Sequence, residues 1–111
     1  MVKEVLESKD FLKSIAKASR IKRKSLLNRA TSTQLRAIQQ ITNNINKNVI
    51  PLTPCQIRKL IKGGYRPHLV NAGKKRKGVN KLKRVLLKHG GFLPFIIPAA
   101  LSYLISHGFK I

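Results

Sequence analysis

The chain has 111 residues, of which 24 are Lys or Arg and 3 are acidic, giving a formal net charge of +21. This length holds one small domain and excludes a second sizeable core. Because an excess of one sign repels itself in a compact state, the composition also argues against a self-contained neutral domain and predicts a polyanionic partner.

The first expected helices lie in the N-terminal part of the chain. Ser8 is the expected N-cap, and Phe11, Leu12 and Ile15 fall on one helical face. We expect this apolar stripe to continue through residues 20–27.

The segment 31–49 predicts a longer amphipathic helix. Thr31 and Gln34 have the spacing of a capping box, and Pro51 is expected to end the helix. Its expected apolar face consists of Leu35, Ile38, Ile41, Ile45 and Val49. The opposite, uncharged polar face consists of Gln39, Gln40, Asn43 and Asn44.

A short helix is predicted over residues 54–62. Thr53 is the expected cap, Pro54 suits the first helical position, and Gln56 completes a second capping box. Gly63 is expected to end the helix in the left-handed conformation. The side chains expected in the core are Ile57, Leu60 and Ile61, while those expected to face outward are Arg58, Lys59 and Lys62.

Residues 71–80 read NAGKKRKGVN and predict a basic loop between glycines. A further amphipathic helix follows, because apolar residues again recur with helical period. Its apolar positions are Val79, Leu82, Val85 and Leu86, and its basic positions are Lys81, Lys83, Arg84 and Lys88.

The C-terminal segment is apolar and uncharged from residue 92 to residue 105. About 20 apolar residues are needed to span a bilayer, so we do not expect a transmembrane helix. Pro94 and Pro98 shorten any helix here, and Pro98 is expected as the first residue of a terminal helix. Three interpretations stay open: the segment packs as core, lies in a membrane interface, or docks into a partner protein. Its candidates for membrane or partner contact are Phe92, Leu93, Phe95, Ile96, Ile97, Leu101, Tyr103, Leu104 and Ile105.

Together these elements predict an all-α fold, a small bundle of short amphipathic helices with a basic loop and an apolar C-terminal helix. We divide the chain into a basic helical nucleic-acid-binding region, 1–90, and an apolar C-terminal tail, 91–111.

The side chains that usually carry out catalysis are sparse. His68, His89 and His107 are scattered along the sequence and no acidic residue follows Asp10, so we expect no enzyme, cofactor, metal site or small-molecule substrate. Cys55 is the only cysteine, which indicates a reducing compartment, and we expect it to be a small buried apolar residue. The first residues lack the apolar core of a secretory signal.

The distribution of charge predicts binding to nucleic-acid phosphate. Glu4, Glu7 and Asp10 are the only carboxylate side chains, so the cations that follow need water, a backbone carbonyl or an external anion. No aromatic or zinc-finger motif for reading bases is present, which favours non-specific contact with double-stranded DNA. The first set of expected contacts is Lys74, Lys75, Arg76, Lys77, Lys81, Lys83, Arg84 and Lys88, and the second is Arg20, Lys22, Arg23 and Lys24. A membrane-active protein drawn to anionic lipid and a ribosomal-type RNA-binding protein stay open as alternatives.

Two short motifs resemble a known family. Residues 51–60, PLTPCQIRKL, and residues 83–105, which include Gly-Gly-Phe-Leu-Pro, resemble the small basic proteins of Polinton (Maverick) elements and adintoviruses, which have been likened to the adenovirus minor core protein pX. The resemblance implies a protein of the virion interior, present in the host nucleus during assembly, that condenses the DNA genome. It also implies capsid proteins as partners of the tail.

The resemblance further implies proteolytic processing after paired glycines. Adenovirus-type maturation proteases cut after Gly-Gly when an apolar residue stands at the fourth position before the cut. Residues 61–64 match this pattern, because Ile61 is apolar and Gly64 is the last residue before a cut at Tyr65. Residues 88–91 depart from it, because Lys88 stands where an apolar residue is required. Paired glycines also end helices without any protease, and this interpretation is the simpler one at both positions.

Overall fold

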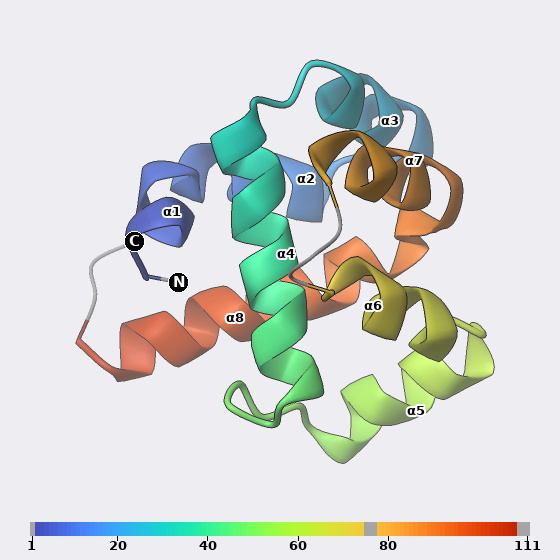
Figure 1. Ribbon diagram of the computed structural model, residues 1–111. Helices are drawn as coiled ribbons and strands as arrows, with labels where there is room; N and C mark the ends of the chain where they lie inside the picture. Colours follow the sequence, from blue (N-terminus) through green and yellow to red (C-terminus); the bar gives the residue numbers. More distant parts are fainter. Residues whose placement is uncertain (1, 75–77, 109–111) are drawn as a thin grey trace.

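Caps, glycines and prolines divide the chain into short helices, as the sequence predicts. The computed structural model describes residues 2–74 and 78–108. Across these ranges the chain forms α-helices and no strand, within a body of 31 × 31 × 29 Å. The predicted all-α bundle is confirmed (Figure 1).

The N-terminal part forms three helices, α1 (Val2–Glu7), α2 (Lys9–Lys17) and α3 (Arg20–Asn28). Ser8 occupies the N-cap position of α2, but its hydroxyl is buried and makes no capping hydrogen bond. The predicted continuous stripe is wrong, because Ala18 is extended and ends α2. Ser19 then starts α3 by accepting a hydrogen bond from the backbone N–H of Lys22 at 3.3 Å.

Helix α4 (Ser32–Asn46) runs through the middle of the bundle and packs against α1, α6, α7 and α8 (Figure 1). Its capping box is confirmed: Thr31 Oγ1 accepts from the Gln34 N–H at 3.2 Å, and Gln34 Oε1 accepts from the Thr31 N–H at 2.9 Å. The helix ends before the predicted Val49, because the chain turns through Asn48 at a φ of 60°. Val49 is therefore 45% exposed. The other four predicted apolar-face residues are buried, namely Leu35, Ile38, Ile41 and Ile45.

Helix α5 (Pro54–Lys62) has the predicted bounds and the predicted capping box of Thr53 and Gln56. Its apolar face was expected in the core, but only Leu60 is buried, while Ile57 is 41% and Ile61 is 55% exposed. The left-handed residue after it is Gly64, at a φ of 67°, whereas Gly63 is right-handed.

Helix α6 (Arg66–Ala72) occupies a stretch for which the sequence predicted no helix. Its Ala72 and the following Gly73 are buried, so the basic loop is shorter than predicted.

The C-terminal helices α7 (Val79–His89) and α8 (Leu93–Ser106) are joined by a 3-10 turn, Gly90–Phe92. Pro98 was expected to start the last helix, but α8 starts five residues earlier and continues through it. Pro94 takes the role predicted for Pro98, since it lies in the first turn, where its missing N–H costs nothing.

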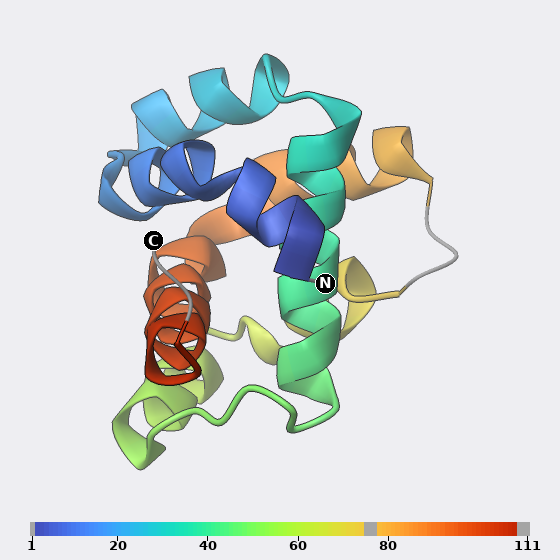
Figure 2. The same ribbon diagram turned by 90° about the vertical axis from the view of Figure 1, so that its left-hand side faces the viewer.

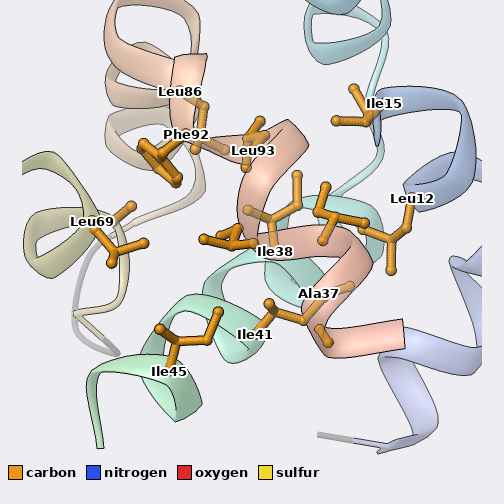
Figure 3. Close-up of a cluster of buried hydrophobic side chains, with 14 of the residues drawn as sticks. Leu12, Ile15, Ala37, Ile38, Ile41, Ile45, Leu69, Leu86, Phe92 and Leu93 are labelled. Carbon is orange, nitrogen blue, oxygen red and sulfur yellow. The ribbon is translucent and has the colours of Figure 1, made fainter. Parts of the chain in front are cut away.

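Helix α8 packs against α2 and α4 and buries one face in the bundle (Figure 2). Phe92 and Leu93 share one apolar cluster with Leu12 of α2 and Ile38 of α4 (Figure 3). Residues assigned to the basic region and to the apolar tail therefore build the same core, and the core interpretation of the C-terminal segment is the one the structure bears out.

Candidate nucleic-acid interface

Two basic clusters that are far apart in the sequence lie on helices that pack together. Helix α3 carries the 20–24 cluster and α7 carries the 81–88 cluster, and the two helices run side by side (Figure 1). Lys83 Nζ joins them by donating a hydrogen bond of 2.6 Å to the carbonyl oxygen of Asn28. The parts of the two predicted patches that lie on helices thus share one basic helix pair, α3–α7.

Exposed cations form a stripe along each helix of the pair. Lys81, Arg84 and Lys88 are exposed and follow each other at spacings of three and four residues, which places them on one side of α7. Arg20 and Lys24 are exposed and four residues apart, so they lie on one side of α3. Lys22 is exposed as well, whereas Arg23 and Lys83 are half-buried. The exposed members are free to contact a polyanion without disturbing the core.

The basic loop leaves the bundle next to α7. Lys74 is exposed at its start, while the predicted contacts Lys75, Arg76 and Lys77 lie outside the described residues. A shallow hollow at the base of the loop is lined by Lys74 and Lys81. Lys74 therefore adds positive charge beside α7.

Gln39 anchors the start of this loop to the bundle. It was predicted on the outer polar face of α4, but its side chain is only 4% exposed. Its Nε2 donates to the carbonyl oxygen of Lys74 at 2.6 Å, and its Oε1 accepts from Arg36 at 2.6 Å. Burial of an amide requires such partners. The sequence held no signal for this role, because Gln39 stands among other polar residues of α4.

Gly73 lets the chain approach α4 closely just before the loop. A Cβ at Gly73 would lie 3.1 Å from the backbone of Asn43 and 2.5 Å from Nδ2 of Asn46. That amide also donates a hydrogen bond of 3.2 Å to the carbonyl oxygen of Leu69. Gly73 was predicted only as a glycine that flanks the basic loop, and the structure shows that its lack of a side chain lets the backbone approach α4.

The acidic residues lie away from the α3–α7 pair. Glu4 and Glu7 belong to α1, which lies on the opposite side of the molecule from α7 (Figure 1), and Asp10 lies in the first turn of α2. A hydrogen bond from the backbone, above all, lowers the pKa of Glu4, so its carboxylate stays charged. The α3–α7 pair therefore carries cations without any acidic side chain on either helix.

The histidines are less scattered in space than in sequence. His68 of α6 and His89 of α7 stack with ring centroids 3.6 Å apart and planes 5° from parallel. Burial lowers the pKa of His89, and the charges of His68 and Lys88 lower it further. Among residues 2–74 and 78–108, no group of three or more His, Cys, Asp or Glu side chains is placed to hold a metal ion. Cys55 was expected to be buried but is exposed in the first turn of α5.

The candidates for membrane or partner contact are mostly part of the core. Those that are buried are Phe92, Leu93, Ile96, Ile97 and Leu104, and those that are half-buried are Phe95, Leu101 and Tyr103. Ile105 alone among them is exposed, at 57%. The stretch Val79–Ser106 is long and apolar enough to cross a membrane by length and composition, with a mean hydropathy of 1.4 in its most apolar window. Of that window 39% is buried in the fold, where α8 turns one face toward the core.

Both glycine pairs make room for the ring of Tyr65. A Cβ at Gly63 would overlap this ring, and a Cβ at Gly91 would lie 2.8 Å from its hydroxyl oxygen. The ring also packs against Phe92 and Phe95, at centroid distances of 6.4 and 6.1 Å. These glycines therefore have a packing role whether or not the chain is cut between Gly64 and Tyr65.

Comparison with protein-family models, with curated proteins and with solved structures finds no match to this chain.

Proposed function

We propose that the protein binds double-stranded DNA without sequence preference and condenses it, as a core protein inside the virion of a Polinton- or adintovirus-like element. The observation that carries the proposal is the α3–α7 pair, where two basic clusters lie on packed helices while the acidic residues lie elsewhere. The resemblance of residues 51–60 and 83–105 supplies the viral part of the proposal.

Electrostatics explain why a basic surface of this kind would bind DNA. Each phosphate neutralised by Lys or Arg releases condensed counterions, which gives strong, salt-dependent and sequence-independent affinity. The net charge of +21 also means that many bound copies neutralise a large part of the duplex, and they lose their mutual repulsion in doing so. Condensation follows from this neutralisation and needs neither catalysis nor a cofactor.

The test is the affinity of the full chain for a random-sequence duplex over a series of salt concentrations. We expect log affinity to fall linearly with log salt. Replacing Lys81, Arg84 and Lys88 by Gln should reduce the magnitude of the slope by about 2 to 3, since each lost phosphate contact removes about 0.9.

A matched control removes the same charge elsewhere. Lys3 and Lys9 are exposed on α1 and α2 beside the acidic residues, and Lys47 is exposed at the end of α4. Their replacement by Gln should leave the slope nearly unchanged. Equal effects of the two triple variants would show that total charge alone binds DNA and would refute the α3–α7 interface. Preference for structured RNA in direct competition would instead support the RNA-binding alternative.

A membrane-active protein is the second candidate, and the apolar stretch Val79–Ser106 is what favours it. Since α8 is part of the core, its apolar residues reach a bilayer only after the bundle opens. Leakage of anionic vesicles caused by the folded full chain, at salt concentrations that preserve its helicity, would favour this candidate over DNA condensation.

A further inference from the structure

An apolar groove of about 390 Å³ opens between the end of α4, the turn that follows it, α5 and α6. Ile50, Leu60 and Leu69 lie in it as buried side chains. Ile57, Ile61 and Val70 line its outer part and are 41%, 55% and 49% exposed. Half of the six large apolar side chains that are exposed in the described ranges therefore line one groove.

The groove exists because one face of α5 has no cover. The apolar residues Ile57, Leu60 and Ile61 have the spacing of a buried helix face, yet only Leu60 is buried. A contiguous exposed apolar patch on a protein often marks an interaction site. Its volume also lies within the range of about 300–1,000 Å³ that is typical of binding pockets.

Charge determines which occupant suits the groove. Arg66 is the only charged residue that lines it, and the neighbouring Lys47, Arg58 and Lys62 are exposed. A second copy of the chain would bring another net charge of +21 to this positive rim, which disfavours self-association. A duplex supplies phosphates but no apolar groups to fill the groove. The complementary occupant combines apolar side chains with carboxylates.

We propose that this groove binds an acidic amphipathic segment of a partner protein. Apolar side chains of the segment enter between α5 and α6, while its Asp or Glu side chains pair with Arg66 and with the cations of α5. This mode corresponds to the docking of an amphipathic helix into an apolar groove.

The groove lies at the opposite end of the molecule from α3, although α6, which forms one wall of the groove, also packs against α7. In both Figure 1 and Figure 2, α3 lies at the top and α5 at the bottom. A partner in the groove therefore leaves α3 free for a polyanion. The inference stands on the groove alone and does not depend on DNA binding.

The experiment measures binding of labelled acidic helical peptides to the full chain by fluorescence anisotropy at physiological salt. Each peptide is about four helical turns long, with Leu or Phe on one face and Glu on the other. A scrambled version has the same composition but no apolar face, and it reports attraction by charge alone. We expect the amphipathic peptides to bind at least about tenfold more tightly than their scrambled versions.

Two substitutions with equal charge change locate the binding. Ile61→Arg fills the groove rim with a cation, and Ile105→Arg makes the same change on α8 at nearly the same exposure, 57% against 55%. Neither residue is in the core, so both variants should keep the fold. We expect Ile61→Arg to abolish the preference for the amphipathic peptides and Ile105→Arg to retain it.

Several outcomes would overturn the proposal. The first is an equal loss of affinity for the amphipathic peptides in Ile61→Arg and Ile105→Arg. The second is equal binding of the amphipathic and scrambled peptides, and the third is no binding of any peptide. Sedimentation of the same samples gives another: a dimer that Ile61→Arg dissociates would assign the groove to a second copy. An aliphatic molecule released from purified wild-type protein, but not from Ile61→Arg, would assign it to a small ligand instead.

Discussion

Replacing Ile96 by Ala would measure how far the apolar C-terminal segment stabilises the fold. Ile96 is 0% exposed in the core cluster. The substitution removes three buried carbon groups, worth about 2.4 kcal/mol at about 0.8 kcal/mol each, and leaves a cavity. We therefore expect the free energy of unfolding to fall by about 2–5 kcal/mol, out of the about 5–15 kcal/mol typical of a domain.

Ile105→Ala is the control, because it makes the same change on the same helix at a side chain that is 57% exposed. It should cost no more than about 0.5 kcal/mol. Urea unfolding followed by far-ultraviolet circular dichroism gives both values. Equal midpoints for the two variants, with unchanged slopes, would refute the assignment of α8 to the core and would return its apolar residues to a membrane or partner.

Three further measurements test other parts of the structure. The pKa of His89 is lowered in the folded state, so below its ordinary pKa the unfolded chain binds more protons at this residue. The contribution of His89 to stability is therefore present above about pH 6.5 and is lost as the pH falls through the lowered pKa. A pH series of melting temperatures should show this decline, and His89→Gln should flatten it. Gly73→Ala should destabilise the fold by about 1–3 kcal/mol because its Cβ would press on the backbone of Asn43, whereas Gly78→Ala, with nothing within 4 Å, should be neutral in the same urea assay. Thr53→Ala should cost about 1 kcal/mol through the lost cap, and an unchanged midpoint would contradict the capping role.

Local chemistry made parts of the fold predictable from the sequence. The capping boxes at Thr31 and Thr53 depend on residues three positions apart, so both were predicted correctly. The end of α4 was not, because it depends on a turn through Asn48 with positive φ. Pro98 was misplaced for a similar reason: the core holds α8 on both sides of it, and this packing outweighs the lost hydrogen bond.

Burial was harder to predict, because it depends on what covers each face. Ile57 and Ile61 have the pattern of core residues, but no other helix covers them. Gln39 has the pattern of a surface residue, but α4 is surrounded by other helices and the amide finds partners inside. Periodicity identifies the faces of a helix, while the number of covered faces depends on the tertiary arrangement.

The candidate interface was predictable in its composition and not in its geometry. Residues 20–24 and 81–88 are rich in Lys and Arg, and no acidic residue after Asp10 is available to pair with them. This composition identified both segments as candidate contacts. That these clusters share one helix pair required the packing of α3 on α7, which involves residues about half the chain apart and includes the hydrogen bond from Lys83 to Asn28.

The position of α8 also governs when the protein can fold during synthesis. Helix α2, which contributes Leu12 and Ile15 to the core, packs mainly against α8, so it lacks its main partner until α8 has left the ribosome. Contacts this distant in sequence form late and slow the search for the native state. In the meantime an unfolded chain with most of its positive charge already synthesised is next to ribosomal RNA, which is itself a polyanion. The time for which α2 lacks its main partner therefore depends on how quickly α8 is made.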